Sequence, residues 1–158
     1  MKHLNLYVYF IILLIFILPI GGTFIEKNVL NSNKDLLTLF AKWFVFSTIG
    51  IRLFSAGLRQ IFNPQFTVEK IFNLTSKENQ ILVRELGFAS CCVGLLGVLS
   101  IFSNQFLISA AITGGLYLGL AGVYHLIKKP VTINEKIAMI SDLIIFLIMI
   151  LIILEKII

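Results

Sequence analysis

The sequence contains few charged residues. Only 13% of its 158 residues are Asp, Glu, Lys or Arg, whereas 58% are hydrophobic. A soluble domain carries about 25% charged and about 45–50% apolar residues, so a soluble surface could not cover this much apolar side chain. The shortage of charge excludes a soluble globular protein and indicates an integral membrane protein. The length predicts a single transmembrane domain over residues 1–158.

Cysteine and histidine are also scarce. The two cysteines, Cys91 and Cys92, are adjacent, and the two histidines are His3 in the N-terminal tail and His125 in an apolar run. Adjacent cysteines rarely form a disulfide, and neither residue type has the spacing of metal ligands. We therefore expect the cysteines to be small packing residues, and we expect no metal site and no haem.

Runs of like charge and enzyme motifs are absent from the sequence. The net charge is +5, but no five consecutive residues share one sign, so a nucleic-acid-binding arm is not expected. Basic loops of a membrane protein instead set its topology and meet anionic lipid. Without a phosphate-binding loop, a serine nucleophile motif, a zinc motif or a dinucleotide fingerprint, the sequence favours a protein that is not an enzyme.

The sequence is rich in long apolar runs. Five of them reach the length of about 20 residues that a helix needs to cross a bilayer. They predict an all-α integral membrane protein with a bundle of five transmembrane helices. The expected helices cover residues 4–25, 36–62, 81–102, 106–127 and 136–154, with an interfacial loop at 63–80.

The expected helix ends carry local signals. Pro19 predicts a kink in the first run, for which a cleaved signal peptide is the alternative interpretation. Capping-box patterns at Thr75–Glu78 and Thr132–Glu135 predict the starts of the third and fifth helices.

The basic residues near the helix ends predict the orientation. With a cytoplasmic N-terminus, more of them lie on the cytoplasmic side than on the opposite side, as the positive-inside rule requires. We therefore expect a multi-pass protein of the inner (plasma) membrane with its N-terminus in the cytoplasm. The cytoplasmic set is Lys2, Lys70, Lys77, Arg84, Lys128, Lys129 and Lys136, and the opposite set is Lys27, Lys34, Lys42 and Lys156.

Ionisable residues within the apolar runs are the candidate functional residues. Arg52 and Arg59 are seven residues apart and lie on nearly the same side of one helix. An arginine within the bilayer costs about 3 kcal/mol on insertion scales, so each needs a partner. The predicted polar or ligand-binding cluster comprises Arg52, Arg59, Arg84, Glu85, His125 and Asp142.

Within this cluster, we predict that Glu85 pairs with Arg59 or Arg52. We predict that Asp142 completes the cluster or binds His125. Two interpretations remain open: the charges specify how the helices assemble, or they line a polar pocket or proton path.

Small residues recur on two of the expected helices. Their spacing lets helices approach closely, and we expect packing within one chain rather than a dimer seam. The predicted packing residues are Gly87, Gly94, Gly97, Gly115, Gly119 and Gly122.

Two stretches resemble the DoxX-like family of small membrane proteins. Gly50–Pro64, with its two arginines, glycine and closing proline, is similar to that family's first helix. Arg84–Phe88 with Gly94–Gly97 resembles the second helix. The resemblance, to an uncharacterised bacterial subgroup, implies a four-helix core over residues 44–154 with an added N-terminal helix. Some DoxX-like proteins are subunits of quinone-linked redox complexes.

Two functional hypotheses follow. The first is a small membrane protein that binds a lipid-like or quinone-like molecule, or that serves as an accessory subunit. Its partners would be the lipid bilayer and a second membrane protein or another copy of the chain. The alternative is a small transporter or proton-coupled carrier that uses the Arg/Glu/Asp cluster. No cofactor is identified by the sequence itself.

Overall fold

The computed structural model describes residues 6–71 and 77–157. Within these residues every regular element is a helix and none is a strand. Five helices are long and apolar enough to cross a membrane, so the all-α, five-helix prediction is confirmed. They span Leu6–Val29, Leu36–Phe62, Lys77–Leu99, Asn104–Lys128 and Ile133–Glu155.

Short π-helical segments, labelled η, interrupt the first two long helices. The first long helix runs through α1 (Leu6–Ile12), η1 (Leu13–Ile17), α2 (Leu18–Phe24) and η2 (Ile25–Val29). The second runs through α3 (Leu36–Val45), η3 (Phe46–Ile51) and α4 (Arg52–Phe62). After these come α5 (Pro64–Phe66), η4 (Thr67–Ile71), α6 (Lys77–Leu99), α7 (Asn104–Lys128) and α8 (Ile133–Ile157).

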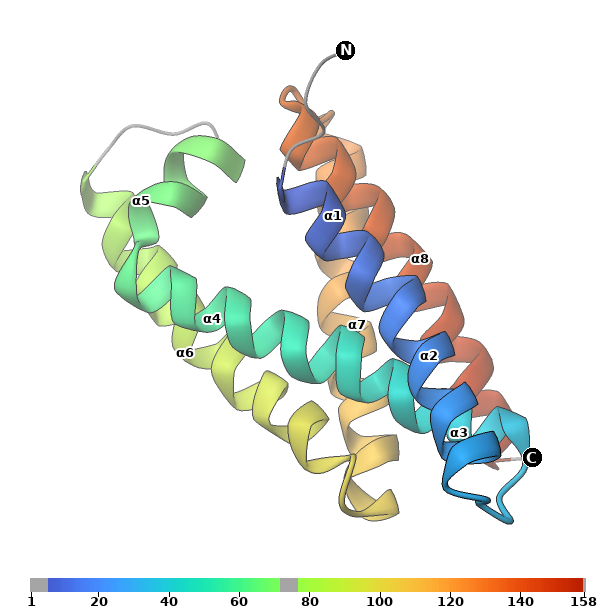
Figure 1. Cartoon of the computed structure of the whole chain (residues 1–158). Coiled ribbons are helices and arrows are strands. Elements are labelled where there is room, and N and C mark those ends of the chain that lie inside the picture. Colours follow the sequence, from blue (N-terminus) through green and yellow to red (C-terminus); the bar gives the residue numbers. More distant parts are fainter. Residues whose placement is uncertain (1–5, 72–76, 158) are drawn as a thin grey trace.

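The second long helix is the central element of the bundle. Of its most apolar window, 56% is buried, against 28% to 44% for the other four long helices. In Figure 1 it crosses the molecule diagonally, with α6 packed along α4, whereas α7 and α8 form a second pair beside α1. The two groups diverge toward the end of the molecule where α5 lies.

Glycines bring the second long helix and α6 into backbone contact. A Cβ atom on Gly97 would overlap the backbone nitrogen of Gly50, and one on Gly94 would overlap that of Phe54. Gly57 faces Cys91 and the carbonyl of Gly87 at similarly short distances. Small residues at this spacing permit close approach of helices in a membrane.

The glycines of α7 pack against larger side chains of α8. Gly115 faces Met149, Gly119 faces the ring of Phe146, and Gly122 faces Leu143 and the Cβ atom of Asp142. All six glycines predicted to pack therefore lie against another helix of the same chain.

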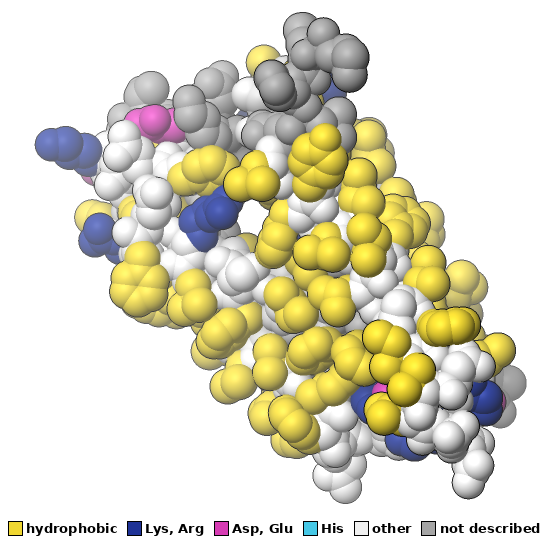
Figure 2. Space-filling model, viewed as in Figure 1, with side chains coloured by type: hydrophobic (Ala, Val, Ile, Leu, Met, Phe, Trp, Pro, Cys, Tyr) yellow, Lys and Arg dark blue, Asp and Glu magenta, His cyan; other side chains and the backbone are white. Residues whose placement is uncertain are grey.

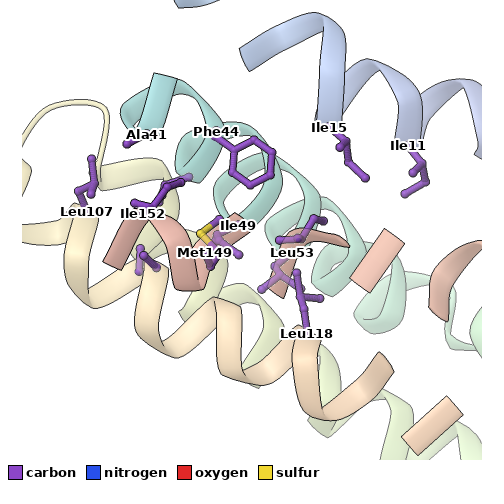
Figure 3. Close-up of a cluster of buried hydrophobic side chains, with 14 residues drawn as sticks. Ile11, Ile15, Ala41, Phe44, Ile49, Leu53, Leu107, Leu118, Met149 and Ile152 are labelled. Carbon is purple, nitrogen blue, oxygen red and sulfur yellow. The ribbon is translucent and has the colours of Figure 1, made fainter. Parts of the chain in front are cut away.

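Apolar side chains from four of the long helices fill the interior of the bundle. Figure 3 shows Ile49 and Leu53 of the second helix close to Leu118 of α7 and Met149 of α8. These four side chains are between 0% and 4% exposed. Leu53 directly follows Arg52, so the charged residue lies at the edge of this apolar core.

The π-helical segment η1 joins the first two long helices through a hydrogen bond. The Leu18 N–H donates to the Leu13 carbonyl, and Pro19 has no N–H to offer to the next carbonyl. The Leu14 carbonyl instead accepts a hydrogen bond of 2.8 Å from the Ser47 hydroxyl. The irregular backbone predicted at Pro19 is thus satisfied by a neighbouring helix, as a membrane interior requires.

The ends of several helices differ from the sequence-based bounds. The first helix extends to Val29, the third ends at Leu99, and the fifth begins at Ile133 instead of 136. The last shift arises because the Thr132 hydroxyl caps the helix, accepting the Glu135 N–H at 3.1 Å. The other expected capping box, Thr75–Glu78, lies partly outside the described residues.

The close backbone contact predicts that one methyl group at Gly97 disrupts the bundle. Gly97→Ala should lower the free energy of unfolding by about 1–3 kcal/mol, because the two helices must separate to admit the Cβ atom. Gly21→Ala is the matched control, since nothing lies within 4 Å of its Cβ position. Denaturant unfolding in detergent measures both variants. Equal stability of the two variants would contradict the packing described here.

Candidate functional site

The centre of the site is an ion pair between the second and the fifth long helices. Nη2 of Arg52 lies 2.5 Å from Oδ1 of Asp142 and donates a hydrogen bond of 2.8 Å to the Ser141 hydroxyl. Both side chains of the ion pair are 8% exposed. The Ser141 hydroxyl in turn donates to the Ala138 carbonyl at 2.8 Å, which fixes its direction.

Equal depth explains why Arg52 meets Asp142. Arg52 is ten residues from the end of α4 at Phe62, and Asp142 is nine residues from the start of α8 at Ile133. At 1.5 Å per residue, both lie roughly 14–15 Å from their helix ends. The sequence-based start of the fifth helix at 136 placed Asp142 too close to the helix end. For this reason its equal depth with Arg52 was not predicted.

The π-helical segment η3 ends directly before Arg52 and influences the direction of its side chain. The Arg52 N–H donates to the carbonyls of Ser47 and Ile49, and the segment keeps Gly50 against α6. Two residues further along a helix is a rotation of about 200°, so Arg52 points away from α6 and toward α8. π-helical segments are frequent at functional sites.

One nitrogen of Arg52 remains available. Nη1 is buried and has no hydrogen-bond partner in the described part of the chain. The Tyr7 hydroxyl of α1 interacts with the Arg52 guanidinium electrostatically and through a weak side-chain hydrogen bond, and electrostatically with Asp142 and Arg59, but no hydrogen bond of normal geometry reaches Nη1. A buried guanidinium with an open donor is costly, because the N–H has lost water without gaining an acceptor.

The polar side chains lie where the two groups of helices diverge. Figure 2 shows an opening in the space-filling surface between the α4–α5 end and α1, with a basic side chain at its border. Arg59 is exposed and lies two turns after Arg52 on the same side of α4. Its Cζ atom is 4.7 Å from the centroid of the Phe66 ring, on which the guanidinium stacks. Helix α4 therefore carries a buried arginine at its start and an exposed one near its end.

Two further polar side chains, one on α6 and one on α7, form a hydrogen bond with each other. The hydroxyls of Ser90 and Tyr117 lie 3.1 Å apart, and Tyr117 interacts electrostatically with Asp142. The site thus draws residues from α1, α4, α6, α7 and α8.

His125 pairs with Glu135 and not with Asp142. Nδ1 of His125 lies 3.4 Å from Oε1 of Glu135, and the two side chains are 8% and 2% exposed. Oε2 of Glu135 also accepts the Val131 N–H at 2.8 Å. These two contacts of Glu135 stabilise the turn between α7 and α8, whereas Asp142 pairs with Arg52.

The predicted pairing of Glu85 with Arg59 or Arg52 is wrong. Glu85 and Arg84 are exposed on α6, and among the described residues neither contacts either arginine. Glu85 is two residues before Gly87, which packs against the second helix, so it points about 200° away from that contact. Two charged residues at the same depth do not form an ion pair when one of the side chains faces away from the other helix.

The sequence analysis missed Tyr7, Ser141 and Glu135 as parts of polar contacts. The capping-box pattern indicated Glu135 only as a residue at the start of the fifth helix. Their spacing held a usable signal: Glu135 and Asp142 are seven residues apart, so both face α7.

An apolar groove lies outside this cluster. A groove of about 230 Å³ between α7 and α8 is lined by apolar residues such as Leu116, Phe146 and Ile150. Across residues 6–71 and 77–157, no group of three or more His, Cys, Asp or Glu side chains could hold a metal ion.

The comparison with known families gives one match. A model of a family of unknown function, DUF6790, matches residues 9–157, nearly the whole chain. The chain belongs to the DUF6790 family. No curated protein and no solved structure matches the chain. For this DUF6790 member, function must therefore be argued from the site itself.

The ion pair predicts strong coupling between Arg52 and Asp142. Arg52→Gln or Asp142→Asn alone should each lower the free energy of unfolding by about 3–5 kcal/mol, because the partner is left buried and charged. The double variant should lose clearly less than the sum. Thermal or denaturant unfolding in detergent gives the double-mutant cycle.

The control cycle uses Arg59→Gln and Glu85→Gln. These residues do not touch, so their effects should add to within about 0.5 kcal/mol. Additive losses at Arg52 and Asp142, or coupling between Arg59 and Glu85, would contradict the described pairing.

Proposed function

We propose that this protein is a small multi-pass membrane protein that binds a lipid-like or quinone-like molecule at Arg52. The observation that carries the proposal is Nη1 of Arg52, a buried donor without a hydrogen-bond partner in the described part of the chain. A ligand oxygen placed there would satisfy it. The apolar surroundings suit a molecule that enters from the membrane.

The energetic cost of leaving a buried donor of Arg52 without an acceptor supports a binding role. If the charges served only assembly, Asp142 could satisfy the guanidinium with two parallel hydrogen bonds, as arginine–carboxylate pairs often do. Here a single nitrogen meets Asp142 and Ser141, and the other points elsewhere. An arrangement that leaves a donor open within a membrane protein favours ligand binding.

The setting of this function is also a proposal. The excess of basic residues on one side of the helices favours the inner (plasma) membrane with a cytoplasmic N-terminus. The resemblance of Gly50–Pro64 to DoxX-like proteins favours a quinone among the candidate ligands, and a role as accessory subunit of a larger complex. The match to DUF6790 supports neither point directly.

A proton-coupled carrier is the second candidate. Its support is Asp142, a carboxylate buried within an apolar helix, because such residues mark ion and proton pathways in transporters. If the protein is such a carrier, proton flux into proteoliposomes should fall when Asp142 is replaced by Asn. Unchanged flux would remove the proposed coupling residue.

Ligand binding predicts co-purification that depends on the residues at the opening. Native mass spectrometry and organic extraction of the purified protein should find a lipid or quinone. Its amount should fall severalfold in Tyr7→Phe and in Arg52→Lys, which keeps the positive charge but loses the forked donor.

Tyr9→Phe is the control, since Tyr9 is on the same helix and 57% exposed. It should retain the ligand at the wild-type level. A wild-type preparation with no co-purifying lipid or quinone and no partner subunit would overturn the proposal.

A further inference from the structure

The two arginines of α4 differ in their ionic partners. Arg52 and Arg59 both lie on the side of α4 that faces away from α6, and Asp142 is the carboxylate that compensates one of them. Glu85 faces outward, and Glu135 is engaged with His125. Arg59 forms no ion pair with another described residue, and its guanidinium lies over the ring of Phe66.

The two arginines lie at different depths and need different ligand groups. Arg59 is three residues from the end of α4, roughly 4.5 Å, and it is exposed. Arg52 is about 10 Å deeper, and Asp142 already neutralises its charge. An anion suits Arg59, whereas a second anion beside Asp142 would leave a buried negative charge uncompensated. Nη1 of Arg52 therefore calls for a neutral oxygen acceptor.

We propose that the ligand is a glycerophospholipid with an anionic headgroup, held at two points. Its phosphate binds Arg59, and an ester carbonyl oxygen accepts a hydrogen bond from Nη1 of Arg52. This inference rests on the proposed function, that the opening at Arg52 binds a lipid-like molecule, and it names the chemical class.

The chemistry of a glycerophospholipid matches the site in order of depth. The phosphate lies outermost, the neutral ester carbonyls follow, and the acyl chains come last. The stacking of Arg59 on Phe66 holds the plane of the guanidinium and leaves its N–H edge open to phosphate. Exposed apolar side chains of the same two helices, including Leu6 of α1 and Leu58 of α4, are available to contact the chains.

Binding of defined lipids to the delipidated full-length protein tests both contacts. Native mass spectrometry compares ester-linked phosphatidylglycerol with its ether-linked analogue, which lacks the carbonyl, and with ester-linked phosphatidylcholine, which has no net charge. The ether analogue should bind about tenfold more weakly, because a hydrogen bond from a charged donor is lost. Phosphatidylcholine should also bind more weakly, and inorganic phosphate should not displace bound lipid.

Two matched variants assign the preferences to residues. Arg59→Gln should abolish the preference for phosphatidylglycerol over phosphatidylcholine while retaining the ester–ether difference. Arg84→Gln removes an exposed arginine of α6 outside the opening and should leave both preferences intact. Arg52→Lys should reduce the ester–ether difference and retain the headgroup preference.

Several outcomes would overturn the inference. Equal affinity for ester-linked and ether-linked lipid removes the carbonyl contact. A headgroup preference that survives Arg59→Gln, or that disappears equally in Arg84→Gln, removes the phosphate contact. If a quinone or another lipid still binds in a manner that depends on Tyr7 and Arg52, the proposed function stands and this inference falls. If nothing binds, both fall.

Discussion

The buried ion pair between Arg52 and Asp142 is the constraint on which the rest of the bundle depends. Neither charge is tolerable alone at this depth, so the second and fifth long helices must stay together and in register. Asp142 is held close to α7 by Gly122, and Arg52 is positioned by the π-helical segment η3. A contact between residues 90 positions apart thereby links three of the five long helices: the second, α7 and α8.

The second long helix serves two purposes through two opposite sides. Gly50 and Gly57 on one side allow α6 to approach within backbone contact. Arg52 and Arg59 lie about 200° around the helix, on the side where Asp142 of α8 and Tyr7 of α1 interact with them. Because α6 is bound tightly on the glycine side, the arginine side can stay incompletely packed. This division explains how a small protein combines a rigid pair of helices with a polar opening.

The sequence was sufficient for the fold and for part of the site. Apolar runs of membrane-spanning length predict the five helices, and the rarity of charge within them singles out Arg52 and Asp142. Partner choice was harder, because it depends on helix starts to within a few residues and on which side a residue faces. Because the fifth helix begins directly after its cap at Thr132, Asp142 lies at the same depth as Arg52. Because Gly87 packs against the second helix, Glu85 faces outward. π-helical segments such as η3 leave no clear pattern in a single sequence.

The central claim is that Arg52 and Asp142 are in direct contact within the bilayer. Solid-state NMR of isotope-labelled protein in lipid bilayers can measure the dipolar coupling between the Arg52 guanidinium nitrogens and the Asp142 carboxyl carbon. The structure predicts a strong coupling to one of the two Nη nitrogens and a weaker one to the other. No coupling to Asp142, or a coupling of Arg52 to Glu85, would contradict this account.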